Sequence, residues 1–150
     1  ILSVAQGVSR DHVGVVLVCQ GMPPEWEQAH HKARAEENYF NQRVRMLLTE
    51  QGLNPDAVRI AWLDWQLPDV TETLRHVVAL GSTHVVVAPS TIVLPTMEST
   101  LDLERSIEGA RLPGDVKIKT LSYWNDDEGI VAAVARSARA ALDASARSTR

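Results

Sequence analysis

Four short apolar segments, each followed by an amphipathic stretch, constrain the fold of this chain more than any other feature of its sequence. Most of them are rich in valine and isoleucine, which favour the pleated, packed surface of a β-sheet. They are Val13–Cys19, Ala57–Leu63, Thr83–Ala88 and Val116–Leu121. The first and third are almost continuously apolar, which is typical of strands buried on both faces. The fourth alternates between polar and apolar residues, which indicates an edge strand with one face in water.

The stretches between these segments have the apolar spacing of helices. The predicted helices run from a cap at Asn38 to Gly52, from a cap at Asp69 to Gly81, from Pro95 to about Gly109, and from about Asp127 to Leu142. Strand–helix alternation with right-handed crossovers predicts an α/β fold: a four-stranded parallel sheet in the order 2-1-3-4, as in flavodoxin-like folds, with helices on both faces. We expect residues 1–12 to end a preceding linker or helix, residues 13–143 to form the α/β lobe, and residues 144–150 to be a frayed tail.

The composition excludes several classes of protein. The chain has 19 acidic and 15 basic residues and a net charge of −4, so we expect no nucleic-acid partner. No charge-free apolar run is long enough to cross a bilayer. The single cysteine, Cys19, excludes a disulfide framework within the chain, and we expect it to be a buried structural thiol. Because the chain begins with Ile1 and has no signal-peptide pattern, we expect a cytoplasmic piece of a longer protein.

Two segments follow the first and third strands, beyond whose carboxyl ends ligands bind in a sheet of this order. Gln20 to Glu37 is predicted to be a loop long enough to act as a lid or binding loop. Pro89–Pro95 is apolar, although it would lie at the mouth of a site. It leads into a helix on which Glu98 and Asp102 are four residues apart, so both carboxylates share one face.

These charged residues each have a chemical and a structural interpretation. Glu98 and Asp102 can bind a hard divalent cation or accept protons from a substrate, or they can simply interact favourably with a helix N-terminus. His30 and His31 can ligate a metal, although adjacent histidines point in different directions and are more often on a solvated turn.

The four tryptophans have the same two interpretations. Trp26, Trp65 and Trp124 can form an aromatic wall for a flat ligand or pack at the rim of the fold, whereas Trp62 is expected in the core. No glycine-rich phosphate loop follows the first strand. Pro23 and Pro24 remove amide donors there, which disfavours a nucleotide site.

Five segments, in order and spread over nearly the whole chain, resemble elements of one known family. They are Cys19–Pro23, Asn38–Tyr39 with Gln42, Trp65–Val70, Val85–Leu103 and Trp124–Ile130. Together they resemble the class II chelatase superfamily, most closely the C-terminal lobe of ferrochelatase. The resemblance implies a chelatase-like fold and a lyase of heme biosynthesis or a related pathway. Such an enzyme inserts a divalent metal (iron, cobalt or nickel) into a porphyrin or sirohydrochlorin-type tetrapyrrole and requires no cofactor.

The resemblance also implies roles for individual residues. Glu98 matches a catalytic and metal-binding glutamate, and Asp102 is expected to assist it as a metal ligand. The position of the family's catalytic histidine is Gln20, whose amide is a poor base and a poor ligand for transition metals. His30, His31 or another lobe would then replace the lost imidazole, and both histidines are expected as metal ligands. The residues implied in tetrapyrrole binding are Met22, Pro23, Trp26, Tyr39, Trp65, Pro89, Ile92 and Val93.

Chelatases of this class work as two lobes, so the resemblance implies a second α/β lobe as partner, in a homodimer or as a missing N-terminal half. Three functions stay open: an active ferrochelatase-like lobe, a degenerate domain that only binds a tetrapyrrole or metal, and a structural lobe that serves a partner. The retained Glu98 favours the first, and Gln20 favours the other two. We expect low or absent metal insertion unless His30 or His31 folds over the site.

Overall fold

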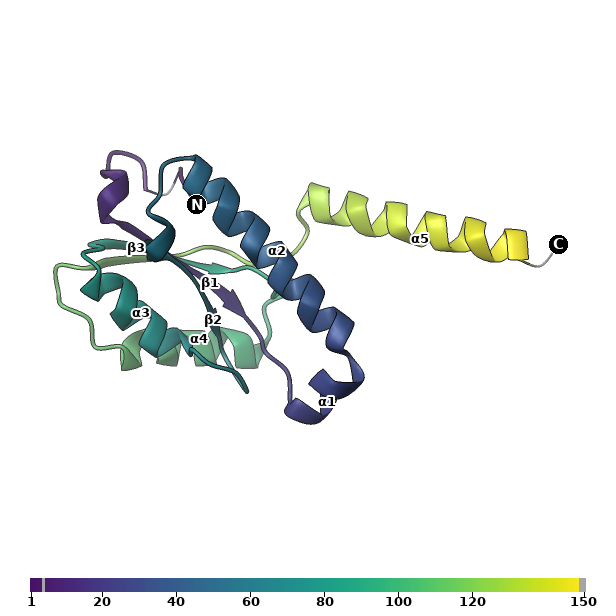
Figure 1. The fold of residues 1–150 in the computed structure, drawn as a ribbon, viewed down its shortest axis with the longest axis horizontal. Helices are drawn as coiled ribbons and strands as arrows, with labels where there is room; N and C mark the ends of the chain where they lie inside the picture. Colours follow the sequence, from purple (N-terminus) through teal and green to yellow (C-terminus); the bar gives the residue numbers. More distant parts are fainter. Residues whose placement is uncertain (4, 149–150) are drawn as a thin grey trace.

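A parallel sheet of four strands forms the centre of the molecule in the computed structural model, which describes residues 1–3 and 5–148 (Figure 1). The strands are β1 (Val13–Cys19), β2 (Val58–Trp62), β3 (His84–Pro89) and β4 (Lys117–Thr120). Their order is β2-β1-β3-β4, and every neighbouring pair is parallel. The α/β fold and the strand order predicted from the sequence are therefore confirmed.

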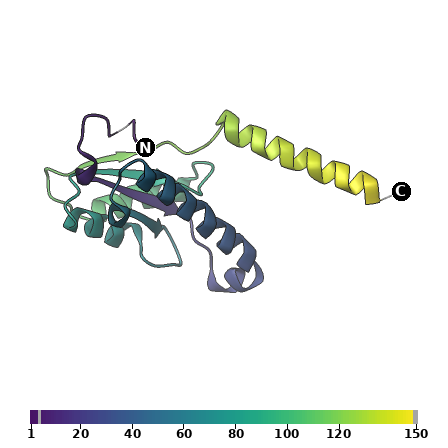
Figure 2. The same cartoon turned by 45° about the horizontal axis from the view of Figure 1, so that its top comes forward.

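Helices pack on both faces of this sheet, as predicted, although the last helix extends away from it (Figures 1 and 2). They are α1 (Pro24–Ala29), α2 (His31–Glu50), α3 (Val70–Ala79), α4 (Met97–Gly109) and α5 (Glu128–Ser148), with short 3-10 helices at Arg10–His12 and Pro55–Ala57. None of the described helices combines the length and apolar composition that a membrane crossing requires.

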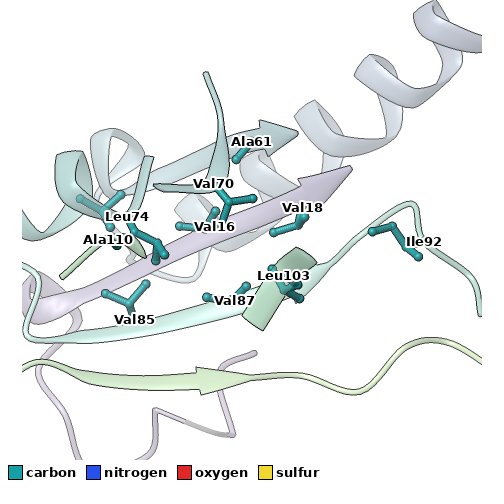
Figure 3. Close-up of a cluster of buried hydrophobic side chains, with 11 residues drawn as sticks. Val16, Val18, Ala61, Val70, Leu74, Val85, Val87, Ile92, Leu103 and Ala110 are labelled. Atoms are coloured by element: carbon teal, nitrogen blue, oxygen red, sulfur yellow. The ribbon is translucent and has the colours of Figure 1, made fainter. Parts of the chain in front are cut away.

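One face of the sheet is covered by α3 and α4. Val16 and Val18 of β1 and Val85 and Val87 of β3 point toward these helices, where Leu74 of α3 packs on them (Figure 3). Each such side chain contributes about 1.5–3 kcal/mol when it is fully buried. The predicted cap of α3 is present, because the Asp69 side chain accepts a hydrogen bond of 2.7 Å from the Glu72 amide.

The opposite face of the sheet is covered by α2 and by the first residues of the chain. Val15 and Leu17 of β1 point to this face, where Leu48 of α2 packs against the same cluster. Ala5 is buried there, and Ile1 packs beside it. The segment expected to end a preceding linker thus packs against the sheet in this structure.

The segment Gln20–Glu37, predicted to be a loop, is mostly helical. Proline presets the backbone angle of a first helical turn, and α1 begins at Pro24. α2 begins at His31, seven residues before the expected cap at Asn38. Both stretches are rich in strong helix formers, but they are largely exposed and therefore lack the apolar periodicity on which the prediction depended.

Two other helix ends differ from the predicted ones. α4 begins at Met97 rather than at Pro95, because Thr96 caps it. The Thr96 side chain accepts a hydrogen bond from the Ser99 amide, and the Ser99 side chain accepts one from the Thr96 amide, each of 3.0 Å. α5 continues to Ser148, into the segment expected to be a frayed tail, of which residues 149–150 lie outside the described residues.

Candidate functional site

The segments that follow β1, β2 and β3 begin side by side at the carboxyl edge of the sheet. The Ser90 amide donates to the carbonyl oxygen of Val18 over 2.8 Å, and the Leu63 amide donates to that of Cys19 over 3.0 Å. The predicted order of strands therefore brings the expected site segments, after β1 and after β3, to one edge, and the segment after β2 joins them there.

Gln20 is half-buried at this edge and is paired with a carboxylate. Its Nε2 donates a hydrogen bond of 3.2 Å to Oδ2 of Asp64, which follows β2. The Asp64 amide in turn donates to the carbonyl oxygen of Gln20 over 3.1 Å. The partner of the Gln20 side-chain amide is thus Asp64.

Gln66 holds the next residues of the same segment. Its Oε1 accepts a hydrogen bond of 3.0 Å from the Met22 amide, and its Nε2 donates one of 2.6 Å to the Met22 carbonyl oxygen. Between Gln20 and Met22, Gly21 has a φ of +86°, and a Cβ there would collide with the Asp64 carbonyl oxygen and lie 2.5 Å from Gln66 Oε1. The position therefore requires glycine.

Large apolar side chains are exposed on the segments around this edge. They are Trp26, Trp65, Leu67, Val93, Leu94 and Met97, and we call them the apolar rim. Trp26 and Trp65 are 64% and 63% exposed, and Met97, beside Glu98, is 79% exposed. Exposed apolar surface of this kind marks sites for ligands or partner proteins.

The predicted ligand-binding residues are divided between this surface and the interior. Trp26, Trp65, Val93 and Tyr39 are exposed, the last on α2, and Met22 and Pro23 are half-buried. Pro89 is buried at the end of β3. Ile92 corrects the expectation: it is 6% exposed and packs with the core beneath α4, so it supports its loop and is not available to a ligand.

The two carboxylates of α4 differ in their surroundings. Glu98 is exposed in the first turn, where the helix dipole favours a negative charge. Asp102, one turn later, is half-buried, and its Oδ1 lies 3.4 Å from Nη1 of Arg105. Glu98 is therefore the carboxylate better placed to meet a substrate.

The expected metal ligands do not gather into a metal centre. His30 and His31 are exposed at the junction between α1 and α2. Among the described residues, no three histidine, cysteine, aspartate or glutamate side chains lie close enough together to hold a metal ion. Any metal that meets Glu98 would have to take its other ligands from elsewhere, such as a tetrapyrrole, water or a second lobe.

Cys19 lies in a buried polar cluster behind the edge. Its Sγ accepts a hydrogen bond of 3.1 Å from Nδ2 of Asn41 and lies 3.8 Å from Oγ of Ser90. Burial, with a smaller contribution from the charge of Glu37, raises the pKa of the Cys19 thiol from 9.0 to about 11. The thiol is therefore protonated at neutral pH and is neither a nucleophile nor a thiolate ligand.

Two of the four tryptophans are packing residues. Trp62 is 7% exposed, as expected, and the guanidinium of Arg34 lies 4.7 Å from its ring centroid. Trp124 packs edge-on against Phe40, and its Nε1 donates to the Ser90 carbonyl oxygen over 2.9 Å. Trp26 and Trp65 are the most exposed of the four tryptophans, whereas Trp124 is 37% exposed.

Sequence reasoning missed Asp64 and Gln66, which position the segment after β1. Gln66 lies within Trp65–Val70, one of the segments that carry the family resemblance. That match is the only signal in the sequence that points to it. Nothing in the sequence pairs either side chain with Gln20 or Met22, 44 residues away.

Comparisons with known proteins give a match at the level of structure. No protein-family model matches the sequence, and no curated protein matches it. A solved structure of a candidate cobalamin (vitamin B12) biosynthesis protein, CbiX, from Marinobacter aquaeolei VT8 matches with a TM-score of 0.55 and 12% identity, over 87% of this chain and 98% of that chain. The two chains share one fold. The chelatase-like α/β fold expected from the sequence is thereby confirmed, and at this identity the likeness extends to the fold alone.

Proposed function

We propose that this chain is a chelatase-type lobe that holds a tetrapyrrole at the carboxyl edge of its sheet and inserts a divalent metal ion into it. The observation that carries the proposal is the exposed carboxylate of Glu98 beside the exposed apolar rim. A flat, largely apolar macrocycle needs such a surface, and it must lose two protons as the metal enters. The shared fold with a protein described as acting in cobalamin biosynthesis supports the same class of substrate.

In this proposal the rim positions the ring, and Glu98 accepts protons from it. Trp26 and Trp65 supply aromatic surface, and Met97 holds apolar contact next to the carboxylate. The metal ion is a substrate: it sheds water, bonds to the ring nitrogens, and two protons leave the ring. Gln20 takes no proton, because its amide is neutral and already hydrogen-bonded to Asp64.

A second candidate function is binding without insertion, as a degenerate lobe or as a structural partner lobe. The Gln20–Asp64 pair favours it, because the position of the family's histidine then holds a neutral amide that is hydrogen-bonded to Asp64 and cannot act as a base. Both candidates leave one side of a bound ring uncovered by this chain. We therefore propose a second α/β lobe opposite the apolar rim, either another copy of this chain or an N-terminal half.

Binding is tested by titrating the intact protein with protoporphyrin, coproporphyrin and sirohydrochlorin while tryptophan fluorescence is recorded. We expect saturable quenching that weakens in Trp26→Phe and Trp65→Phe. The matched control is Trp62→Phe, which removes a buried tryptophan and should leave the affinity unchanged. Absence of saturable quenching with all three compounds would contradict both metal insertion and tetrapyrrole binding by this chain.

Insertion is tested with Fe(II), Co(II) and Ni(II) in the wild type and in Gln20→His. The substitution introduces an imidazole beside Asp64, and the carboxylate should raise its pKa above the usual value of about 6.5. General-base help of roughly 10²–10⁴-fold is the expected scale. Adding Glu98→Gln should abolish the gain. If Gln20→His inserts no metal while binding is intact, the second candidate is correct.

A further inference from the structure

Arg34, on α2, is a half-buried cation with an unpaired donor. Its side chain is 19% exposed, and its Nη1 atom is buried and forms no hydrogen bond with any described residue. A guanidinium keeps its charge at every pH at which proteins fold and has several N–H donors. A buried donor without a partner destabilises the fold, most of all when the group is charged. An acceptor from outside the chain would remove this cost.

Two neighbours hold the guanidinium of Arg34 without satisfying its donors. Its Cζ lies 4.7 Å from the ring centroid of Trp62, which is a cation–π contact and uses no hydrogen bond. Its Nε lies 3.9 Å from Oε1 of Glu27, an ion pair too long for a hydrogen bond. The Glu27 side chain is 40% exposed, so this pair is screened by water and weak. The guanidinium is thus fixed in orientation and already attracts a carboxylate.

Arg34 lies at the margin of the apolar rim. α1 and the beginning of α2 lie beyond the carboxyl end of β1 in both views (Figures 1 and 2). Glu27 directly follows Trp26 of the rim on α1, and Trp62 is the last residue of β2. A tetrapyrrole has apolar faces, and its carboxylates are on short, flexible arms at the periphery of the ring. A ring held against Trp26 can therefore extend such an arm to Arg34.

We propose that Arg34 binds a peripheral carboxylate of the tetrapyrrole, in place of Glu27, and so selects substrates that carry one. The inference rests on the proposed function and adds to it a residue that determines specificity. A guanidinium binds a carboxylate in its own plane through two parallel hydrogen bonds, so the stacking of Arg34 on Trp62 is retained. Glu27 has to move aside for this exchange. α1 allows the movement because none of its residues is buried.

The test compares coproporphyrin with its full methyl ester, which has the same ring and no carboxylates. Both are titrated into the intact protein in the same mild detergent, and the Soret band of the ligand is recorded because it does not depend on the tryptophans. We expect the wild type to bind the acid roughly 10- to 100-fold more tightly than the ester, the scale of a hydrogen-bonded charge pair. Arg34→Met should remove this preference and leave the affinity for the ester unchanged.

Two further variants separate carboxylate binding from a structural role of Arg34. Arg34→Lys keeps the charge but not the planar fork, so it should lose part of the preference for the acid and retain the fold if Arg34→Met does not. The matched control is Arg43→Met, which removes an exposed arginine from the same helix and should bind as the wild type does. Equal weakening of acid and ester in the Arg34 variants, or no change in either, would overturn the inference.

The same titration distinguishes this inference from the function on which it rests. If the wild type binds acid and ester equally, the tetrapyrrole site stands and the role of Arg34 is wrong. If it binds neither compound, the proposed function fails and the inference fails with it.

The exchange with Glu27 has its own test. Glu27→Gln removes the competing carboxylate and should raise the affinity for coproporphyrin by up to about fivefold, the strength of a partly exposed ion pair. Glu25→Gln makes the same change of charge at an exposed position on the same helix and serves as the matched control. Equal effects of the two substitutions, or weaker binding in Glu27→Gln, would overturn the exchange.

Discussion

Gly21 controls the geometry of the segment after β1, and Gly21→Ala measures how strongly. An L-residue at a φ of +86° costs about 1–2 kcal/mol. The added Cβ would also collide with the Asp64 carbonyl oxygen, so the segment has to move. That movement breaks the Asp64–Gln20 backbone hydrogen bond and both bonds between Gln66 and Met22, each with a net contribution of about 1 kcal/mol. The expected loss is therefore about 4–5 kcal/mol in the free energy of unfolding.

The matched control for this variant is Gly52→Ala. Gly52 has nearly the same φ, +90°, but a Cβ there meets nothing within 4 Å. It should cost only the backbone strain of about 1–2 kcal/mol. Urea denaturation measures the loss of unfolding free energy in both variants. In thermal unfolding, each kcal/mol of difference between them shifts Tm by about 2–4 °C for a chain of this length. If Gly21→Ala costs no more than Gly52→Ala, the contacts with Asp64 and Gln66 do not fix the segment and the account of the site's rigidity is wrong.

Two further predictions concern Cys19 and the cap of α4. The thiol of Cys19 has a pKa of about 11 in the folded protein, above its ordinary 9.0, so its contribution to stability is fully present below about pH 9 and is lost as the pH rises toward 11. Labelling by a thiol reagent at pH 8 should therefore be slow in the folded protein and fast in urea. Fast labelling of the folded protein would contradict the burial of this thiol. Thr96→Ala removes the side chain that caps α4 and should lower the free energy of unfolding, measured in urea, by about 1 kcal/mol. Thr96→Ser keeps a hydroxyl and should lower it much less. Equal losses in the two variants would mean that the capping hydrogen bond contributes little.

The sheet could be predicted because its buried strands are short, continuous apolar segments, a pattern that is visible in the sequence. β1 is buried along its whole length, and a continuous valine-rich run has no other common explanation in a chain that alternates strands and helices. α1 and the first turns of α2 were missed for the opposite reason. None of residues 31–37 of α2 is buried, so these first turns have no apolar face to detect and only helix propensity indicated the structure.

The candidate site was predictable in position but not in its contacts. Strand order alone brought Gln20 and the segment before Glu98 to one edge of the sheet. The pairing of Gln20 with Asp64 depends on side-chain geometry between residues 44 apart, for which no local pattern exists. In the same way, Ile92 was expected to contact a tetrapyrrole, although its side chain packs in the core. The apolar spacing of α5 was visible in the sequence, but the direction in which this helix leaves the sheet was not (Figure 1).

The most direct test of the tetrapyrrole site is the response of the indole N–H signals in ¹⁵N–¹H NMR spectra while coproporphyrin is added. The four signals are assigned by replacing each tryptophan with phenylalanine. The account predicts saturable shifts, from the ring current of the macrocycle, at Trp26 and Trp65 and none at Trp62, which is buried. Unchanged signals at Trp26 and Trp65 at saturating ligand, or shifts at Trp124 alone, would contradict the claim that the carboxyl edge holds a tetrapyrrole.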